Sequence, residues 1–149
     1  MEIVKVCTSQ GSLGKNPGCE KAPEAILDEL KKIETNESGK KIEFKVSDSE
    51  INENDLDETY KSIENTTGDV VLGGDHSISY PIVKAFAKIE ENPLLIVFDA
   101  HVDCLDSGKI PNNRGWLRKL IEEGFNSSKI ILISTRNIFS EEIEFLEKN

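Results

Sequence analysis

The amino-acid sequence predicts an α/β fold built from βαβ units around a mainly parallel sheet. Short runs rich in β-branched residues alternate along the chain with segments in which apolar residues recur at helical spacing. The length of 149 residues suits one domain, because about 150 residues is the usual size of a domain. No repeat, low-complexity tract or linker divides the chain, so we expect a single domain over residues 1–149.

Composition and charge narrow the classes of partner. Lys and Arg number 18 against 28 Asp and Glu, for a formal net charge of -10, and this balance opposes binding to nucleic acid or to an anionic membrane. No apolar run approaches the roughly 18 residues that would span a bilayer, and we expect no targeting segment, because Met1–Val4 lack a basic region ahead of an apolar stretch. The 3 cysteines show no Cys-x-x-Cys spacing. We therefore expect a cytoplasmic protein with reduced thiols.

The predicted strands are short and bounded by polar or turn-forming residues. In chain order they are Ile3–Cys7, Ile42–Val46, Asp69–Leu72, Leu94–Phe98 and Lys129–Ser134. The last two are almost wholly apolar, as is typical of parallel strands that helices cover on both faces. We therefore expect these two strands to be central in the sheet.

The helices follow from apolar spacing and from proline. The first begins at Pro23, a residue suited to the first helical turn, and ends before the turn-forming segment Thr35–Gly39. A helix that follows His76 must carry Pro81 in its first turn. Further helices are predicted over Asp55–Asn65, over Gly115–Glu123 and from Ser140 onward. Trp116 lies on the apolar face of its helix, and we predict it to be a core residue.

The chain contains 2 histidines, and each stands beside carboxylates directly after a predicted strand. His76 lies in the segment Val71–Ser77 and His101 in the segment Val97–Asp103. Ligand sites of open parallel sheets lie at the carboxyl ends of strands. Both segments can therefore deliver polar side chains to one site, although a single histidine is often a hydrogen-bonded structural residue.

The residues before the first histidine suit a turn at the sheet edge. Gly73 and Gly74 allow the backbone to turn sharply, which would place His76 over the end of the strand. Asp75 is a candidate hydrogen-bond acceptor that orients the His76 ring.

The second segment carries a candidate metal-binding pattern. Asp99, His101 and Asp103 alternate along the chain, and in an extended backbone such side chains project to the same side at intervals of about 7 Å. Carboxylates and an imidazole without a thiolate pair suit a divalent ion such as Mn²⁺ rather than structural zinc.

These residues resemble a known family. Gly73–Ser77 followed by Phe98–Asp103 resembles the first two signature motifs of the ureohydrolase family, which includes arginase, agmatinase and formiminoglutamase. Gly18–Ile26 is similar to the glycine-rich entry into the family's first helix, and Ile133–Arg136 resembles the strand that ends in its Gly-x-Arg segment. The resemblance extends over essentially the whole chain but only over the N-terminal part of a usual family member.

The resemblance implies a three-layer α/β/α fold, arginase-like, with a manganese centre of two ions at the strand ends. His76, Asp99 and Asp103 would bind one ion, Asp99 would bridge, and His101 would bind the second. Asp99 and His101 are accordingly the candidate catalytic residues. In that family a metal-bridging hydroxide attacks the carbon of a guanidino or amidino compound and a C–N bond is hydrolysed.

One departure from the family concerns the C-terminal motif. The family's Ser-x-Asp-x-Asp-x-x-Asp-Pro segment, which supplies further metal ligands, does not occur in residues 1–149. The chain therefore resembles a family member truncated at its C-terminus, with room for one manganese ion or none. The alternative interpretation is a catalytically silent metal-binding or assembly module with the same half-fold. A deacetylase of related architecture fits the motifs less well.

Arg114 marks a second departure, because arginase-like members often place a histidine there, before a glycine. A guanidinium stays protonated and is no general base, but it can bind a substrate carboxylate through two hydrogen bonds. Arg114 is either such a substrate contact or a surface residue before a helix. The resemblance also implies a small guanidino or amidino substrate and a homo-oligomer.

Overall fold

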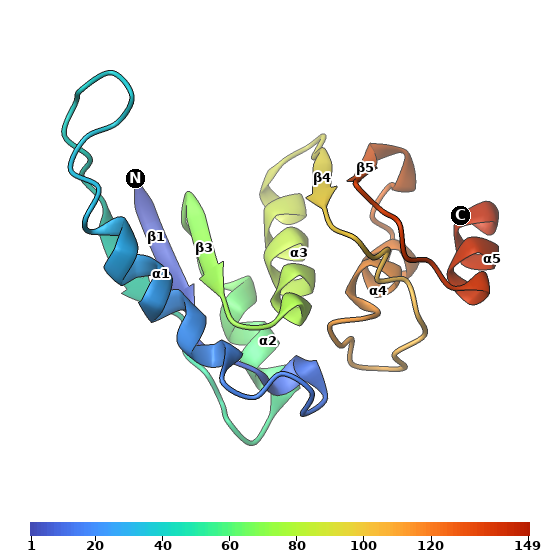
Figure 1. Ribbon diagram of the computed structural model, residues 1–149. Helices are drawn as coiled ribbons and strands as arrows, with labels where there is room; N and C mark the ends of the chain where they lie inside the picture. The colour runs from blue at the N-terminus through green and yellow to red at the C-terminus, as the bar shows by residue number, and fades with distance from the viewer. The chain divides into compact units, whose positions relative to one another are not determined.

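The computed structural model describes residues 1–149, in which parallel strands alternate with helices (Figure 1). The chain divides into two compact units, Met1–Asp75 and His76–Asn149. Each unit contains its own sheet of parallel strands. No helix is long and apolar enough to cross a membrane.

The sheet of the first unit has the strand order β2-β1-β3. Its strands are β1 (Glu2–Val6), β2 (Lys45–Asp48) and β3 (Val70–Gly73). The central β1 is the most buried, with Ile3, Val4 and Val6 all at 0% exposure. β-Branched side chains pack well on such a pleated, enclosed surface, so the composition of β1 suits its place between two neighbours.

The β2 strand begins later than the predicted Ile42. The N–H of Ile42 donates to the carbonyl of Glu34 at 3.0 Å, and Thr35 and Lys41 form an antiparallel bridge. These hydrogen bonds hold the start of the predicted strand in a local turn. Pairing with β1 starts only at Lys45, where the backbone reaches Met1.

Helices and 3₁₀ turns connect the strands of the first unit. They are η1 (Gln10–Ser12), η2 (Cys19–Lys21), α1 (Ala22–Leu30) and α2 (Leu56–Glu64). Pro23 lies in the first turn of α1, as predicted, and the Asp55 carboxylate caps α2 by accepting the N–H of Glu58 at 3.1 Å. Ile63 of α2 is 1% exposed, whereas Ile26 of α1 is 45% exposed.

Gly74 leads the chain out of β3 by close packing rather than by an unusual φ. Neither Gly73 nor Gly74 has a positive φ. A Cβ on Gly74 would lie 2.1 Å from the carbonyl oxygen of Thr8, so no larger residue fits there without a backbone shift. The predicted use of glycine for a sharp turn is therefore not what requires Gly74, since the requirement comes from the space beside Thr8.

The second unit pairs β4 (Leu95–Phe98) with β5 (Ile130–Ile133). Its helical elements are η3 (His76–Ile78), α3 (Ser79–Ile89), α4 (Trp116–Glu122), η4 (Ser127–Lys129) and α5 (Ser140–Lys148). Pro81 lies in the first turn of α3, as predicted. The core of this unit includes Trp116, Leu117 and Leu120 of α4.

The prediction that the last two strands are central and covered on both faces is wrong for this sheet. It has no strands besides β4 and β5, and alternate residues of both are exposed. Phe98, for example, is 76% exposed. Successive side chains of a strand point to opposite faces, so the alternating pattern means that one face is covered and the other is not.

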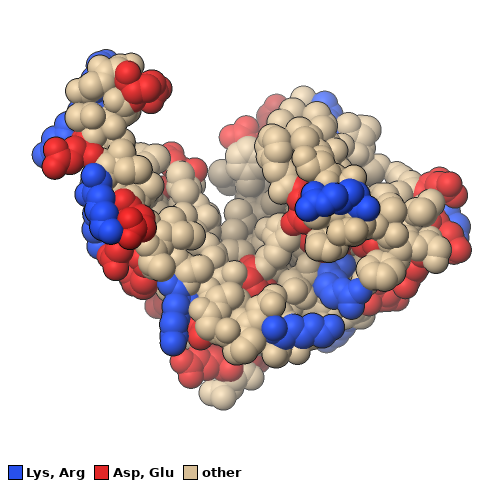
Figure 2. All heavy atoms as spheres, in the orientation of Figure 1, with Lys and Arg blue, Asp and Glu red and all other residues tan.

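Charged side chains of both signs are dispersed over the surface. On the face drawn in Figure 2, basic and acidic side chains are interspersed and no continuous basic surface forms. The lack of a continuous basic surface on this face is in line with the excess of acidic residues, which gives a formal net charge of -10.

The part-buried hydroxyl of Tyr80 links α3 to Glu123, the residue that follows α4. The hydroxyl donates to Glu123 Oε2 at 2.7 Å and accepts from Lys84 Nζ at 2.9 Å. Burial raises the pKa of Tyr80 to about 12. The neutral phenol is therefore the form that the folded unit stabilises.

Truncation of a buried isoleucine in the first unit tests its core. We expect Ile63→Ala to lower the free energy of unfolding by about 2–5 kcal/mol, because it removes buried methyl groups and leaves a cavity. The matched variant Ile26→Ala, at a half-exposed helix position, should change the free energy of unfolding by no more than about 0.5 kcal/mol. Urea titrations measure both. Equal effects of the two variants would contradict the assignment of the core.

Tyr80 predicts a loss of stability at alkaline pH. Its pKa is 10.0 when unperturbed and about 12 in the folded protein, so its contribution is fully present below the lower value and is lost as the pH rises through the higher one. Urea unfolding of wild type and Tyr80→Phe on either side of this interval measures the effect. The stability difference between the two proteins should shrink at the higher pH, and a constant difference would refute the assignment.

Candidate metal centre

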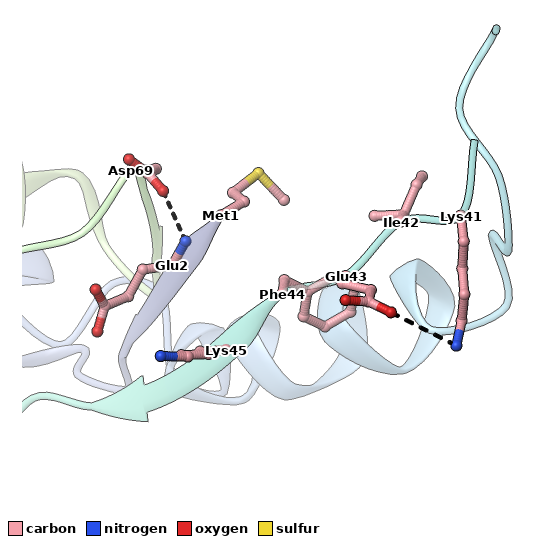
Figure 3. A pocket seen from close by; sticks show the side chains of 8 residues that line it. All are labelled: Met1, Glu2, Lys41, Ile42, Glu43, Phe44, Lys45 and Asp69. Atoms are coloured by element: carbon pink, nitrogen blue, oxygen red, sulfur yellow. Dashed lines mark hydrogen bonds and ion pairs between the residues drawn. The ribbon is translucent and has the colours of Figure 1, made fainter.

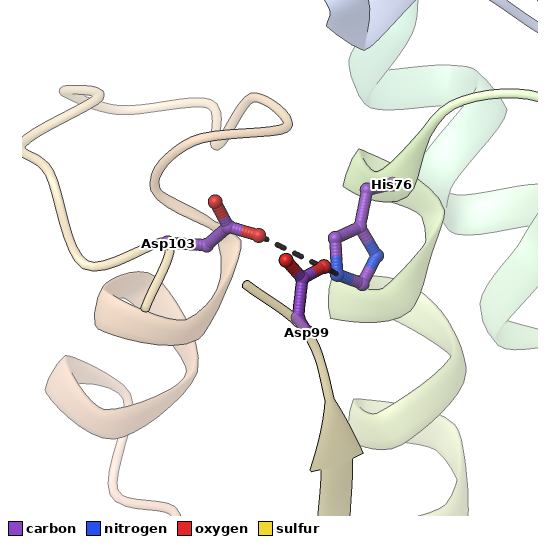
Figure 4. Close-up of side chains that lie close together, drawn as sticks. All are labelled: His76, Asp99 and Asp103. Atoms are coloured by element: carbon purple, nitrogen blue, oxygen red, sulfur yellow. Dashed lines mark ion pairs between the residues drawn. The ribbon is translucent and has the colours of Figure 1, made fainter. Parts of the chain in front are cut away.

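Three side chains gather in the second unit with their ligand atoms close together (Figure 4). His76 opens η3, Asp99 directly follows β4, and Asp103 lies in the loop that leads toward α4. One ligand atom from each lies within 4.8 Å of the others. Of the motif residues that the sequence singles out, these are the ones that the fold brings into one cluster.

The imidazole of His76 faces both carboxylates. Its Nε2 lies 3.2 Å from Asp99 Oδ2 and 3.4 Å from Asp103 Oδ2, yet this buried atom forms no hydrogen bond of acceptable geometry. Nδ1 lies 3.0 Å from Ser79 Oγ. A buried nitrogen without a hydrogen bond, aimed at two carboxylates, matches the arrangement of side chains that share a cation.

Burial and hydrogen bonding affect the two carboxylates differently. Burial acts to raise the pKa of Asp99, but the backbone N–H of His101 and the imidazole of His76 hold that pKa below its usual value. Burial raises the pKa of Asp103, although His76 and the indole N–H of Trp116 act in the opposite direction. A divalent cation between them would favour the ionised form of both groups.

Asp103 is held in an uncommon backbone conformation. Its φ is 56°, in the left-handed region that non-glycine residues rarely adopt. Two residues at the start of α4 hold it there: the N–H of Leu117 donates to the Asp103 carbonyl at 3.2 Å, and Trp116 Nε1 donates to Asp103 Oδ2 at 3.0 Å. Strain of this kind persists where surrounding contacts determine the geometry.

Trp116 is buried, as the sequence predicts, at 1% exposure. Its contact with the carboxylate cluster was not predicted. A general rule could have indicated it, because a buried indole N–H usually finds a hydrogen-bond acceptor. The helical spacing alone did not reveal that the acceptor is Asp103.

His101 lies beside this cluster but outside the group of three ligand atoms. The backbone N–H of His101 donates to Asp99 Oδ1 at 2.8 Å, and the ring atom Nδ1 lies 3.4 Å from the same oxygen. The His101 side chain is 57% exposed. Asp99 therefore directs one oxygen toward each histidine. The expected alternation requires an extended backbone through residue 103, whereas the chain bends at Ala100 and has a left-handed φ at Asp103.

The predicted role of Asp75 stays a prediction. Asp75 Oδ2 accepts the N–H of Gly11 at 3.1 Å within the first unit. The hydrogen-bond partner that the structure places at His76 Nδ1 is Ser79. Ser79, one helical turn from His76, thus orients the ring in this structure.

Arg114 lies in the loop before α4 and stacks on an aromatic ring. Its guanidinium carbon is 5.4 Å from the centroid of the Phe139 ring. The backbone N–H of Arg114 donates to Asn112 Oδ1 at 2.9 Å, and the backbone carbonyl of Arg114 accepts the N–H of Leu105 at 3.0 Å. The backbone of Arg114 is therefore fixed, and its use as a substrate contact stays a prediction.

A surface pocket of about 750 Å³ lies in the first unit (Figure 3). It is lined by Met1, Glu2, Lys41, Ile42, Glu43, Phe44, Lys45 and Asp69. Asp69 accepts the N–H of Glu2 at 2.7 Å and Lys41 pairs with Glu43 at 3.8 Å. The pocket lies where β1 and β2 begin, whereas ligand sites of parallel sheets lie where strands end. The cluster around His76 is therefore the stronger candidate site.

Comparison with known sequences finds formimidoylglutamases and arginases. Formimidoylglutamase of Halalkalibacterium halodurans is 49% identical over 57 residues, which are 37% of this chain and 18% of that protein. Mitochondrial arginase 1 of Oryza sativa subsp. indica is 33% identical over 93 residues, 59% of this chain and 27% of that protein.

Solved structures share the fold. Formimidoylglutamase from Bacillus subtilis superposes with a TM-score of 0.88 at 24% identity, over 99% of this chain and 52% of that chain. Formiminoglutamase from Trypanosoma cruzi, solved with Mn²⁺, superposes with a TM-score of 0.83 at 17% identity, over 99% of this chain and 57% of that chain. This chain thus spans about half the length of these structures.

The superpositions confirm the predicted arginase-like α/β fold. Residues 2–149 also match the sequence pattern of the Arginase family. The match includes both histidine segments, which the resemblance to the ureohydrolases had singled out. This chain belongs to the Arginase family.

Proposed function

We propose that this chain forms the manganese-binding part of a ureohydrolase-type enzyme, which hydrolyses a C–N bond in a guanidino or amidino compound. The observation that carries the proposal is the buried Nε2 of His76, which lies within 3.4 Å of two carboxylate oxygens and forms no hydrogen bond. Carboxylate ligands suit Mn²⁺, and the similar formiminoglutamase from Trypanosoma cruzi was solved with Mn²⁺. The names of the relatives support the substrate class.

The geometry suggests a role for each ligand. His76, Asp99 and Asp103 would hold one cation through the atoms that gather around Nε2. Asp99 would bridge to a second cation at His101, because its Oδ1 faces His101 while its Oδ2 faces His76. Bound divalent cations would polarise water and the C–N group of the substrate. Asp99 and His101 are therefore the proposed catalytic residues.

Residues around the ligands would hold them in the required state. Ser79 lies at Nδ1 of His76 and leaves Nε2 as the coordinating atom. The Asp103 side chain is 10% exposed, so little water competes for its oxygens. We propose that Asp75 would also orient His76.

Arg114 is proposed to bind a carboxylate of the substrate. Its charge is permanent and its planar donors match a carboxylate, and it forms no ion pair within the chain that would occupy them. Stacking on Phe139 at 5.4 Å restricts the guanidinium to one side of that ring. A substrate with a free carboxylate would gain from this contact, and one without it would not.

A second candidate function is a metal-binding or assembly module without hydrolytic activity. It is favoured by the observation that three side chains gather around one point while His101 lies outside that group. Such a site would hold a single cation. The number of cations bound per chain therefore separates the two candidates.

The substrate would be a small molecule, with neither nucleic acid nor membrane as partner. The protein would act in the cytoplasm, as a homo-oligomer of chains with one domain each.

Manganese binding tests the site. We expect the purified protein to bind Mn²⁺, and Asp99→Asn to bind it at least about tenfold more weakly, because even the loss of a residue that supports a ligand costs about 10- to 100-fold. Isothermal titration calorimetry and elemental analysis measure affinity and stoichiometry. Asp106→Asn is the matched control, since Asp106 pairs with Arg118 at 3.7 Å outside the cluster. Equal Mn²⁺ affinity of Asp99→Asn and wild type would refute the proposed ligand set.

Substrate preference tests Arg114. Manganese-loaded protein is assayed with arginine and formiminoglutamate, which carry carboxylates, and with agmatine, which carries none. We expect Arg114→Gln to raise KM for a carboxylate substrate by about tenfold or more, because a charged hydrogen bond contributes about 1.5–3 kcal/mol. Lys109→Gln, which removes a charge from an exposed position in the same loop, should leave KM unchanged. Absence of hydrolysis by wild type with every substrate would favour the module instead.

A further inference from the structure

Trp116 contacts two of the three clustered side chains at once. Its Nε1 donates to Asp103 Oδ2 at 3.0 Å, and its ring centroid lies 5.1 Å from that of His76 at an interplanar angle of 52°. It is 1% exposed and is the single tryptophan of the chain. A buried indole N–H needs an acceptor, and here that acceptor is a carboxylate of the candidate metal cluster.

The hydrogen bond selects one orientation of the Asp103 carboxylate. The oxygen that accepts from Trp116 is Oδ2, and the same oxygen lies 3.4 Å from His76 Nε2. Rotation of the carboxylate away from His76 would leave a buried indole N–H without a partner, which is unfavourable. The indole therefore stabilises the orientation in which Asp103 faces the imidazole.

The backbone around Trp116 is determined by tight packing. A Cβ on Gly115 would lie 2.4 Å from the carbonyl oxygen of Leu105 and 2.5 Å from Ser107 Oγ. Directly after Trp116, the N–H of Leu117 holds the Asp103 carbonyl at 3.2 Å. The start of α4 therefore holds Asp103 by both its backbone and its side chain.

We propose that Trp116 is a positioning residue of the metal site, which holds the Asp103 carboxylate and the His76 ring in their coordinating geometry before a cation binds. This inference rests on the proposed function, because it assumes that these side chains bind Mn²⁺. It assigns a role to a residue that touches neither metal nor substrate. Ligands held in place in advance bind a cation more tightly, because less freedom is lost on binding.

Removal of the indole N–H tests the proposal. Trp116→Phe keeps an aromatic ring but cannot donate to Asp103, and we expect its Mn²⁺ affinity in calorimetry to fall about tenfold or more. The matched control is Tyr80→Phe, which removes another buried aromatic donor to a carboxylate, Glu123, in the same unit. Its Mn²⁺ affinity should equal that of wild type. Undiminished affinity of a folded Trp116→Phe would overturn the proposal.

A double-mutant cycle separates positioning from general stability. If Trp116 acts through Asp103, its substitution should change Mn²⁺ affinity much less in an Asp103→Asn background than in wild type. Additive effects of the two substitutions would overturn the proposal. Lack of Mn²⁺ binding by wild type would instead refute the proposed function, so the two failures are distinguishable.

A measurement on the wild-type protein covers the case in which Trp116→Phe does not fold. Because there is one tryptophan, a proton–nitrogen correlation spectrum contains one indole signal. We expect this signal to be protected from solvent exchange and to broaden when paramagnetic Mn²⁺ is added below stoichiometry. Rapid exchange of the indole proton, or an indole signal unchanged by bound Mn²⁺, would contradict the proposed contact.

Discussion

The electrostatic balance around His76 Nε2 is the constraint on which the candidate site depends. Two carboxylate oxygens lie within 3.4 Å of this nitrogen, and the Asp103 side chain is largely removed from water. Ionised carboxylates in such a place repel each other and are poorly solvated. A shared divalent cation would relieve both costs. The raised pKa of Asp103 reflects this balance.

Each clustered side chain is positioned by a different part of the second unit. The η3 turn carries His76, the end of β4 carries Asp99, and contacts with the start of α4 hold Asp103. The site exists only when these elements pack together. Cation binding and folding of this unit should therefore be thermodynamically linked, since a dispersed set of ligands binds metal poorly.

Local signals were sufficient to predict the type of every major element, because backbone preferences act over a few residues. Pro23 and Pro81 both lie in first helical turns, as predicted. Boundaries and coverage were less predictable. The β2 strand begins at Lys45 and not at Ile42, because the backbone N–H of Ile42 is hydrogen-bonded within a neighbouring turn. The exposure of Phe98 depends on which elements pack against its sheet.

The sequence by itself determined the chemistry of the site: histidines and aspartates placed where strands end, a pattern that already resembles the ureohydrolases. Only the tertiary structure decided how those residues combine. It brings Asp99 and Asp103 to His76 and leaves His101 outside this group, because the segment is not extended: its backbone bends at Ala100 and has a left-handed φ at Asp103. It also gives the indole of Trp116 a carboxylate partner. Residue identity is local information, whereas the direction of a side chain depends on packing between distant segments.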